Sequence, residues 1–270
     1  MWELPCNPPP HPLAATTATH ITNLISHTRF ENKMDSICVV CGKTGRELQT
    51  CKRCRSIQYC SKQCQVYDWK CHKFLCKESP YPPKDPKITS VRAIYFPADS
   101  RQPRFVELPY TVEHDEDSGV WHKVHHSAII NKSWFIQYIE VGVNRVATRN
   151  LGYNIEIRIK EDGLVDGISK PNICVQAVRG ANEWHRYEWH GPLLVLKSKA
   201  RLGWDPNVLH MDIQMEDMRN FIDYVKLYPL TGSELDARVT EMKNKIVNTK
   251  IHLPGMFPQC FIYHTDLLTL

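Results

Sequence analysis

Residues 38–76, CVVCGKTGRELQTCKRCRSIQYCSKQCQVYDWKCHKFLC, hold eight of the eleven cysteines in a chain of 270 residues. The other three, Cys6, Cys174 and Cys260, are scattered through the rest of the sequence. A secreted protein held together by disulfides would spread its cysteines, whereas clustered thiols in a reducing compartment are typical of metal binding. The distribution therefore predicts an intracellular protein that binds metal through this segment.

The segment contains four pairs of possible zinc ligands. Two pairs have the spacing Cys-x2-Cys, which brings two sulfurs onto one ion, and two have three intervening residues, which places both ligands on one face of a helix. The pairs are Cys38 with Cys41, Cys51 with Cys54, Cys60 with Cys64, and His72 with Cys76. Eight ligands fill two tetrahedral sites, so we predict two structural zinc ions and no catalytic residue.

Cys71 is a ninth candidate, directly beside His72. On a helix, His72 and Cys76 are about 40° apart in azimuth, whereas Cys71 and Cys76 are about 140° apart. Cys71 should therefore face away from the ion that Cys76 binds. Spacing alone does not decide how the four pairs combine, because it permits sequential as well as interleaved pairing.

These motifs, including YCSKQCQ and DWKCHKFLC, resemble the MYND-type zinc finger, which would cover about a seventh of the chain. The resemblance implies interleaved binding, with one zinc on Cys38, Cys41, Cys60 and Cys64 and the other on Cys51, Cys54, His72 and Cys76. It also implies binding of short proline-rich peptides, with Gln65 and Trp69 at the contact positions. The alternative is that Trp69 only packs the small core of the finger. Relatives often carry Lys or His before this tryptophan, where this chain has Asp68, so their peptide specificity does not transfer.

The rest of the chain predicts an α+β protein, in which the small two-zinc finger precedes a β-rich antiparallel domain with C-terminal helices. The expected parts are a disordered tail at 1–33, the finger at 34–78, a proline-rich linker at 79–90, a β-rich domain with a closing helix at 91–230, and a C-terminal helix and tail at 231–270. The β-rich part loosely resembles regions that follow MYND fingers in uncharacterised fungal proteins.

Six runs rich in β-branched and aromatic residues predict strands. They are VRAIYFPA (91–98), RFVELPYTVE (104–113), SWFIQYIEVGV (133–143), YNIEIRIKEDG (153–163), NICVQAVRG (172–180) and PLLVLKSK (192–199). In the fourth run the isoleucines alternate with Glu156, Arg158 and Lys160, which predicts a sheet with one solvated face.

Two helices are expected after the strands. Apolar residues at helical spacing predict one at 213–227, and Ser233 is the expected cap of another. Between strands, the stretch at 113–126 carries His114, His122, His125 and His126. We interpret it as a solvated loop, although a His-x2-His pair is an alternative metal site.

The charge and hydropathy of the sequence argue against nucleic-acid binding and against a membrane span. The net charge is +5, and the segment from Asp35 to Glu78 has nine basic and four acidic residues. The segment alone therefore has an excess of five positive charges. Seven thiolates bound to two Zn²⁺ would add a charge of −3, and the remaining charge of about +2 is too small for a strong nucleic-acid site. No apolar run approaches the ~18–20 residues of a membrane span.

We therefore predict a protein–protein interaction module in the nucleus or cytoplasm that is not an enzyme. It would recognise proline-rich or extended segments of a regulatory or transcriptional partner. The alternative is an enzyme, such as a protein lysine methyltransferase, or a small-ligand binder, with its site at 91–230. A deep pocket with converging His, Asp or Glu side chains would favour that alternative. The sequence does not indicate an oligomeric state.

Overall fold

The computed structural model describes residues 36–45, 47–78, 89–115, 119–127, 129–130, 136–180, 187–199 and 208–249. The predicted tail at 1–33, most of the predicted linker and the chain from residue 250 onward lie outside these ranges. The described residues belong to one compact unit, Asp35–Leu270. No helix in the described ranges is long and apolar enough to cross a membrane.

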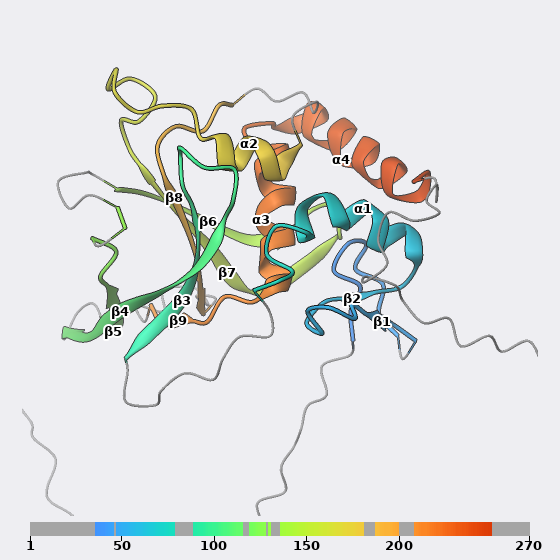
Figure 1. Cartoon of the computed structure of the whole chain (residues 1–270), viewed down its shortest axis with the longest axis horizontal. Coiled ribbons are helices and arrows are strands. Elements are labelled where there is room, and N and C mark those ends of the chain that lie inside the picture. The colour runs from blue at the N-terminus through green and yellow to red at the C-terminus, as the bar shows by residue number, and fades with distance from the viewer. Residues whose placement is uncertain are drawn as a thin grey trace, which may run out of the picture. The chain divides into compact units, whose positions relative to one another are not determined.

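A seven-stranded antiparallel sheet dominates the described structure (Figure 1). Its order is β5-β4-β3-β8-β7-β6, and the short β9 pairs with β8. The strands are β3 (Ser90–Phe96), β4 (Arg104–Asp115), β5 (Gly119–Val124), β6 (Ile136–Asn144), β7 (Arg149–Lys160), β8 (Leu193–Lys199) and β9 (His210–Met211). The cysteine-rich segment contributes a separate ribbon of β1 (Gln49–Thr50) and β2 (Gln58–Tyr59). The predicted α+β class, an antiparallel domain with C-terminal helices, is confirmed.

Four helices accompany the strands in the described ranges: α1 (Lys62–His72), α2 (Ile173–Arg179), α3 (Met215–Leu227) and α4 (Gly232–Val247). The helix predicted at 213–227 is α3. The predicted cap of α4 is wrong, because Thr231 has the extended backbone that an N-cap needs and Ser233 already lies inside the helix.

One predicted strand is a helix. The run 172–180 was expected to be a strand because of its valines, but it forms α2. The Asn172 side chain caps the helix by accepting a hydrogen bond from the Val175 backbone at 2.8 Å, and Gly180 ends it. The buried Cys174, Val175 and Val178 are spaced as one face of a helix, so end signals and helical spacing outweigh the strand preference of single residues.

The two faces of the sheet are covered differently. One face, with Ile155 and Ile157 of β7, packs into an apolar core shared with α3 and with the buried finger residues Val39 and Leu75. The other face was expected to be solvated, and that prediction is wrong. Glu156, Arg158 and Lys160 on it are only 4%, 5% and 7% exposed. A second apolar cluster, which includes Val124 and Ile130, covers part of this face.

The candidate metal centre

Both Cys-x2-Cys pairs lie in tight turns closed by backbone hydrogen bonds. In the first turn, the Gly42 amide donates to the Cys38 carbonyl at 3.0 Å. In the second, the Arg55 amide donates to the Cys51 carbonyl at 2.9 Å. Such turns point both thiols of a pair to the same side, as binding of one ion requires.

Helix α1 positions the other two pairs. Its N-cap, Ser61, accepts a hydrogen bond from the Cys64 backbone at 3.2 Å, so the helix begins between Cys60 and Cys64. At the other end, the Cys76 amide donates to the His72 carbonyl at 3.0 Å, which keeps these two residues one turn apart. Each pair therefore presents its two ligand atoms from one side of the chain.

The eight side chains gather into two groups of four, and within each group all ligand atoms lie within 4.8 Å of one another. The groups are Cys38, Cys41, Cys60 and Cys64, and Cys51, Cys54, His72 and Cys76. This is the interleaved arrangement. Cys71 belongs to neither group; its thiol donates to the Val178 carbonyl of α2 at 3.2 Å.

The distances within the groups suit zinc. Sulfurs at 2.3 Å from a tetrahedral ion lie about 3.8 Å apart. The Cys60–Cys64 and Cys51–Cys76 sulfur pairs are 3.7 and 3.9 Å apart, and His72 Nε2 is 3.5 Å from the Cys51 sulfur. The thiols of this group also interact closely with one another: hydrogen bonds with Cys54 and Cys76 lower the pKa of Cys51, and hydrogen bonds with Cys51 and Cys54 raise the pKa of Cys76. The two groups fit two zinc ions.

The far nitrogen of His72 faces buried polar groups. His72 Nδ1 lies 3.4 Å from the Tyr59 hydroxyl and 3.7 Å from Asp68 Oδ2, and the Tyr59 hydroxyl donates to Asp68 at 2.7 Å. A carboxylate behind a ligating histidine fixes the orientation of the ring. Sequence reasoning noted Asp68 only as a departure from relatives, and the structure places it in support of His72.

Asp68 also joins the finger to the sheet domain. Helix α1 packs beside α3 and α4 (Figure 1). Arg219 of α3 forms an ion pair with Asp68 at 3.5 Å and lies over the Tyr67 ring at 4.7 Å. Of the two predicted peptide contacts, Gln65 lies on the buried face of α1 and is 7% exposed, whereas Trp69 is half-buried with its ring 5.8 Å from that of His72.

Comparison with protein families gives a match over the metal-binding segment. The profile described as the MYND finger matches residues 38–76. Residues 38–76 are a MYND finger. Fingers of this type mediate protein–protein interaction. The predicted recognition of the finger and the predicted two zinc ions are confirmed. No solved structure is significantly similar to the chain.

Curated relatives share the finger but little else. A SET domain-containing protein of Caenorhabditis elegans is 38% identical over 55 residues, 20% of this chain and 13% of the relative. A hypoxia-inducible factor prolyl hydroxylase of the same species is 38% identical over 64 residues, which are 23% of this chain and 9% of the relative. Ubiquitin carboxyl-terminal hydrolase 19 of Arabidopsis thaliana is 51% identical over 41 residues, which are 15% of this chain and 6% of the relative. The chain thus spans a small fraction of the length of these relatives.

The prediction that the chain is not an enzyme is wrong. It rested on the closed metal coordination and on the absence of familiar catalytic motifs. The relatives that share the finger include proteins named as a prolyl hydroxylase and a ubiquitin hydrolase. MYND fingers therefore occur in enzymes, and a closed zinc site in the finger excludes no activity elsewhere in a chain.

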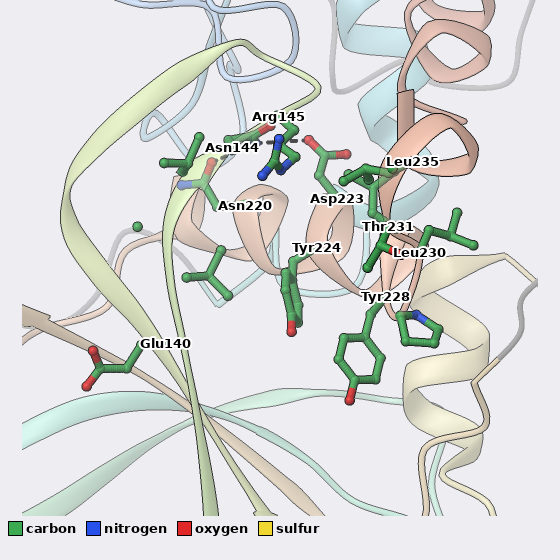
Figure 2. Close-up of a pocket in the computed structure, with 16 residues that line it drawn as sticks. Glu140, Asn144, Arg145, Asn220, Asp223, Tyr224, Tyr228, Leu230, Thr231 and Leu235 are labelled. Atoms are coloured by element: carbon green, nitrogen blue, oxygen red, sulfur yellow. Dashed lines mark hydrogen bonds between the residues drawn. The ribbon is translucent and has the colours of Figure 1, made fainter. Parts of the chain in front are cut away.

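A groove of about 530 Å³ lies between the end of β6 and the junction of α3 and α4. Figure 2 shows Tyr224 and Tyr228 along it, with Asn144 and Asp223 nearby. The Asn144 side chain donates to Asp223 at 3.0 Å, and Asp223 binds Arg219. One buried polar chain therefore runs from this groove through Arg219 to the residues behind His72.

Proposed function

We propose that the MYND finger is a zinc-stabilised docking module that binds an extended, proline-rich segment of a regulatory or transcriptional partner at the outward face of α1. The observation that carries the proposal is the division of α1 into two faces. Tyr67, Asp68 and Cys71 are buried toward the sheet domain, whereas Lys62, Lys70 and Trp69 keep exposed surface.

Trp69 is the main contact in this proposal. A proline-rich segment is pre-extended, and its rings pack well on a flat aromatic side chain. Gln65 contributes only the small part of its surface that stays accessible. The exposed charges on this face are the lysines Lys62, Lys70 and Lys73, so acidic residues beside the prolines should strengthen binding.

Titration of the zinc-loaded full chain with synthetic proline-rich peptides, followed by the backbone amide NMR signals of α1, tests the proposal. We expect saturable shifts and a loss of about thirtyfold in affinity for Trp69→Ala, the size of an aromatic hot spot. The matched control is Tyr138→Ala, which removes an aromatic side chain that is 55% exposed on the sheet domain. An unchanged affinity in Trp69→Ala, with both zinc ions still bound, would count against the proposal.

A further inference from the structure

A second cleft, of about 610 Å³, lies on the sheet face that was expected to be solvated. Its lining includes Arg158 and Glu156 of β7, His122 of β5 and His210 of β9, with Tyr138 of β6 at 55% exposure. The side chains of Arg158, Glu156 and His210 are 6%, 5% and 2% exposed. Strands far apart in the sequence thus bring buried charge and imidazole to one cavity, the arrangement expected of a ligand site.

Arg158 has more hydrogen-bond donors than partners in this cleft. Its Nε donates to Glu156 at 2.5 Å, and its terminal nitrogens lie 3.1 Å from His126 Nδ1 and 3.3 Å from His210 Nε2. A guanidinium carries five N–H groups and accepts none. In the described part of the chain, at least two N–H groups of this buried side chain therefore have no acceptor, although buried donors are normally satisfied.

His210 also has a buried polar atom without a partner among the described residues. Its Nε2 lies 3.1 Å from Glu156 Oε2, but its buried Nδ1 has no hydrogen-bond partner among the described residues. Each oxygen of Glu156 already has one partner, Arg158 Nε at Oε1 and His210 Nε2 at Oε2. The other carboxylate at the cleft, Glu140, accepts from Asn154 at 3.0 Å.

Two histidines at the cleft, His122 and His126, have a lowered pKa. Burial first, and then the charge of His210, lowers the pKa of His122. Burial first, and then the charge of Arg158, lowers the pKa of His126. Neutral imidazoles suit a transition metal, but the guanidinium lies among them and would repel a cation. In the described ranges, metal-ligand groups occur only in the finger.

We propose that this cleft binds a small molecule through a carboxylate or phosphate group held by Arg158. Two parallel N–H groups on one guanidinium match two oxygens of such a group. Trp121 and Tyr138, which also line the cleft, would pack against the remainder of the molecule. Because Arg158 and Lys123 are balanced by Glu156 and Glu140, selection comes from directed hydrogen bonds rather than from net charge.

The test is a titration of the zinc-loaded full chain with inorganic phosphate and, separately, with benzoate, followed by the ring signals of the histidines in NMR. Chloride at equal ionic strength is the salt control. We expect saturable shifts at His122, His126 and His210 and none at His114, which is exposed on β4. A response to phosphate alone identifies a phosphate ligand, and a response to benzoate alone identifies a carboxylate ligand.

Two variants locate the binding. Arg158→Lys keeps the charge but loses the paired donors, and should weaken binding about tenfold or more. His126→Ala acts at the half-buried edge of the cleft, where folding should survive, and should also weaken it, whereas His114→Ala should not. The proposal is overturned if wild type gives no saturable shift, if chloride gives the same shift, or if His126→Ala binds as tightly as wild type.

Discussion

Removal of the Arg219 guanidinium tests whether a buried ion-pair network holds the finger to the sheet domain. The Arg219 side chain is 1% exposed. It donates to Asp223 from Nε at 3.1 Å and from Nη2 at 2.5 Å, and pairs with Asp68 of α1 at 3.5 Å. Arg219→Met retains much of the side-chain volume but leaves two buried carboxylates without their cation.

The expected loss of stability in Arg219→Met is large compared with the loss expected when a surface ion pair is broken. Removing one partner of a buried ion pair costs about 3–5 kcal/mol, because the other charge stays buried without compensation. Lys245 pairs with Glu241 at the same four-residue spacing on α4, and both side chains are nearly half exposed. Lys245→Met should therefore cost only about 0.3–0.5 kcal/mol. Arg219→Lys should fall between them, because it keeps the charge and loses the bidentate geometry.

The assay is thermal unfolding of zinc-loaded protein, with zinc release followed by a colorimetric chelator. For a chain of this size, Arg219→Met should lower Tm by roughly 10 °C and Lys245→Met by about 1 °C. Adding Asp223→Asn to Arg219→Met removes one of the two buried carboxylates that lack a cation, and should restore part of the lost Tm. If Arg219→Met unfolds within a degree or two of Lys245→Met, the network does not hold the two parts together and the reasoning fails.

Three further predictions concern single residues. Cys71→Ser should keep two zinc ions by native mass spectrometry, whereas Cys76→Ser should lose one, since Cys71 is in neither ligand group. Gly42→Ala should lower the free energy of unfolding by roughly 1–3 kcal/mol in chemical denaturation, because its φ is +75° and a Cβ would clash with a carbonyl of the β6–β7 turn. Gly152→Ala is the control for backbone strain alone, because its φ is +72° and a Cβ there would meet open space. Burial raises the pKa of Cys174 to about 12, so iodoacetamide should not modify it in folded protein at pH 8. Because this pKa is raised, the thiol favours folding below pH 9, and its contribution should fade as pH rises toward 12; labelling at pH 8 without denaturant would contradict the prediction.

The metal centre was predictable because zinc geometry acts over short stretches of chain. A turn holds two thiols three positions apart, and a helix holds ligands four apart, so spacing alone identified all four pairs. Which two pairs share one zinc ion could be predicted only from the family resemblance. Asp68 and Arg219 are 151 positions apart, and no local pattern in the sequence links a residue beside the last ligands to a helix in the other domain.

The face of the sheet that carries Glu156 and Arg158 shows where alternation stops being informative. A period of two identifies residues that share a face, but the segments that cover the face decide whether it is wet. Here β5 and the chain just after it bring His122 and His126 over the strand. The predicted solvated loop at 113–126 was wrong for this reason: its second half is mainly β5, and the Tyr110 and His122 rings stack at 4.1 Å.

The two faces of α1 restrict how a partner could use the finger. A finger on a flexible linker could present any side of its helix, but here Tyr67, Asp68 and Cys71 are already engaged by α2 and α3. A partner must approach from the side of Trp69 and the lysines or displace a buried ion pair. Displacement would also expose the apolar core that the finger shares with the sheet domain, and would therefore weaken binding. Packing against the sheet domain therefore selects the orientation in which the finger can be recognised.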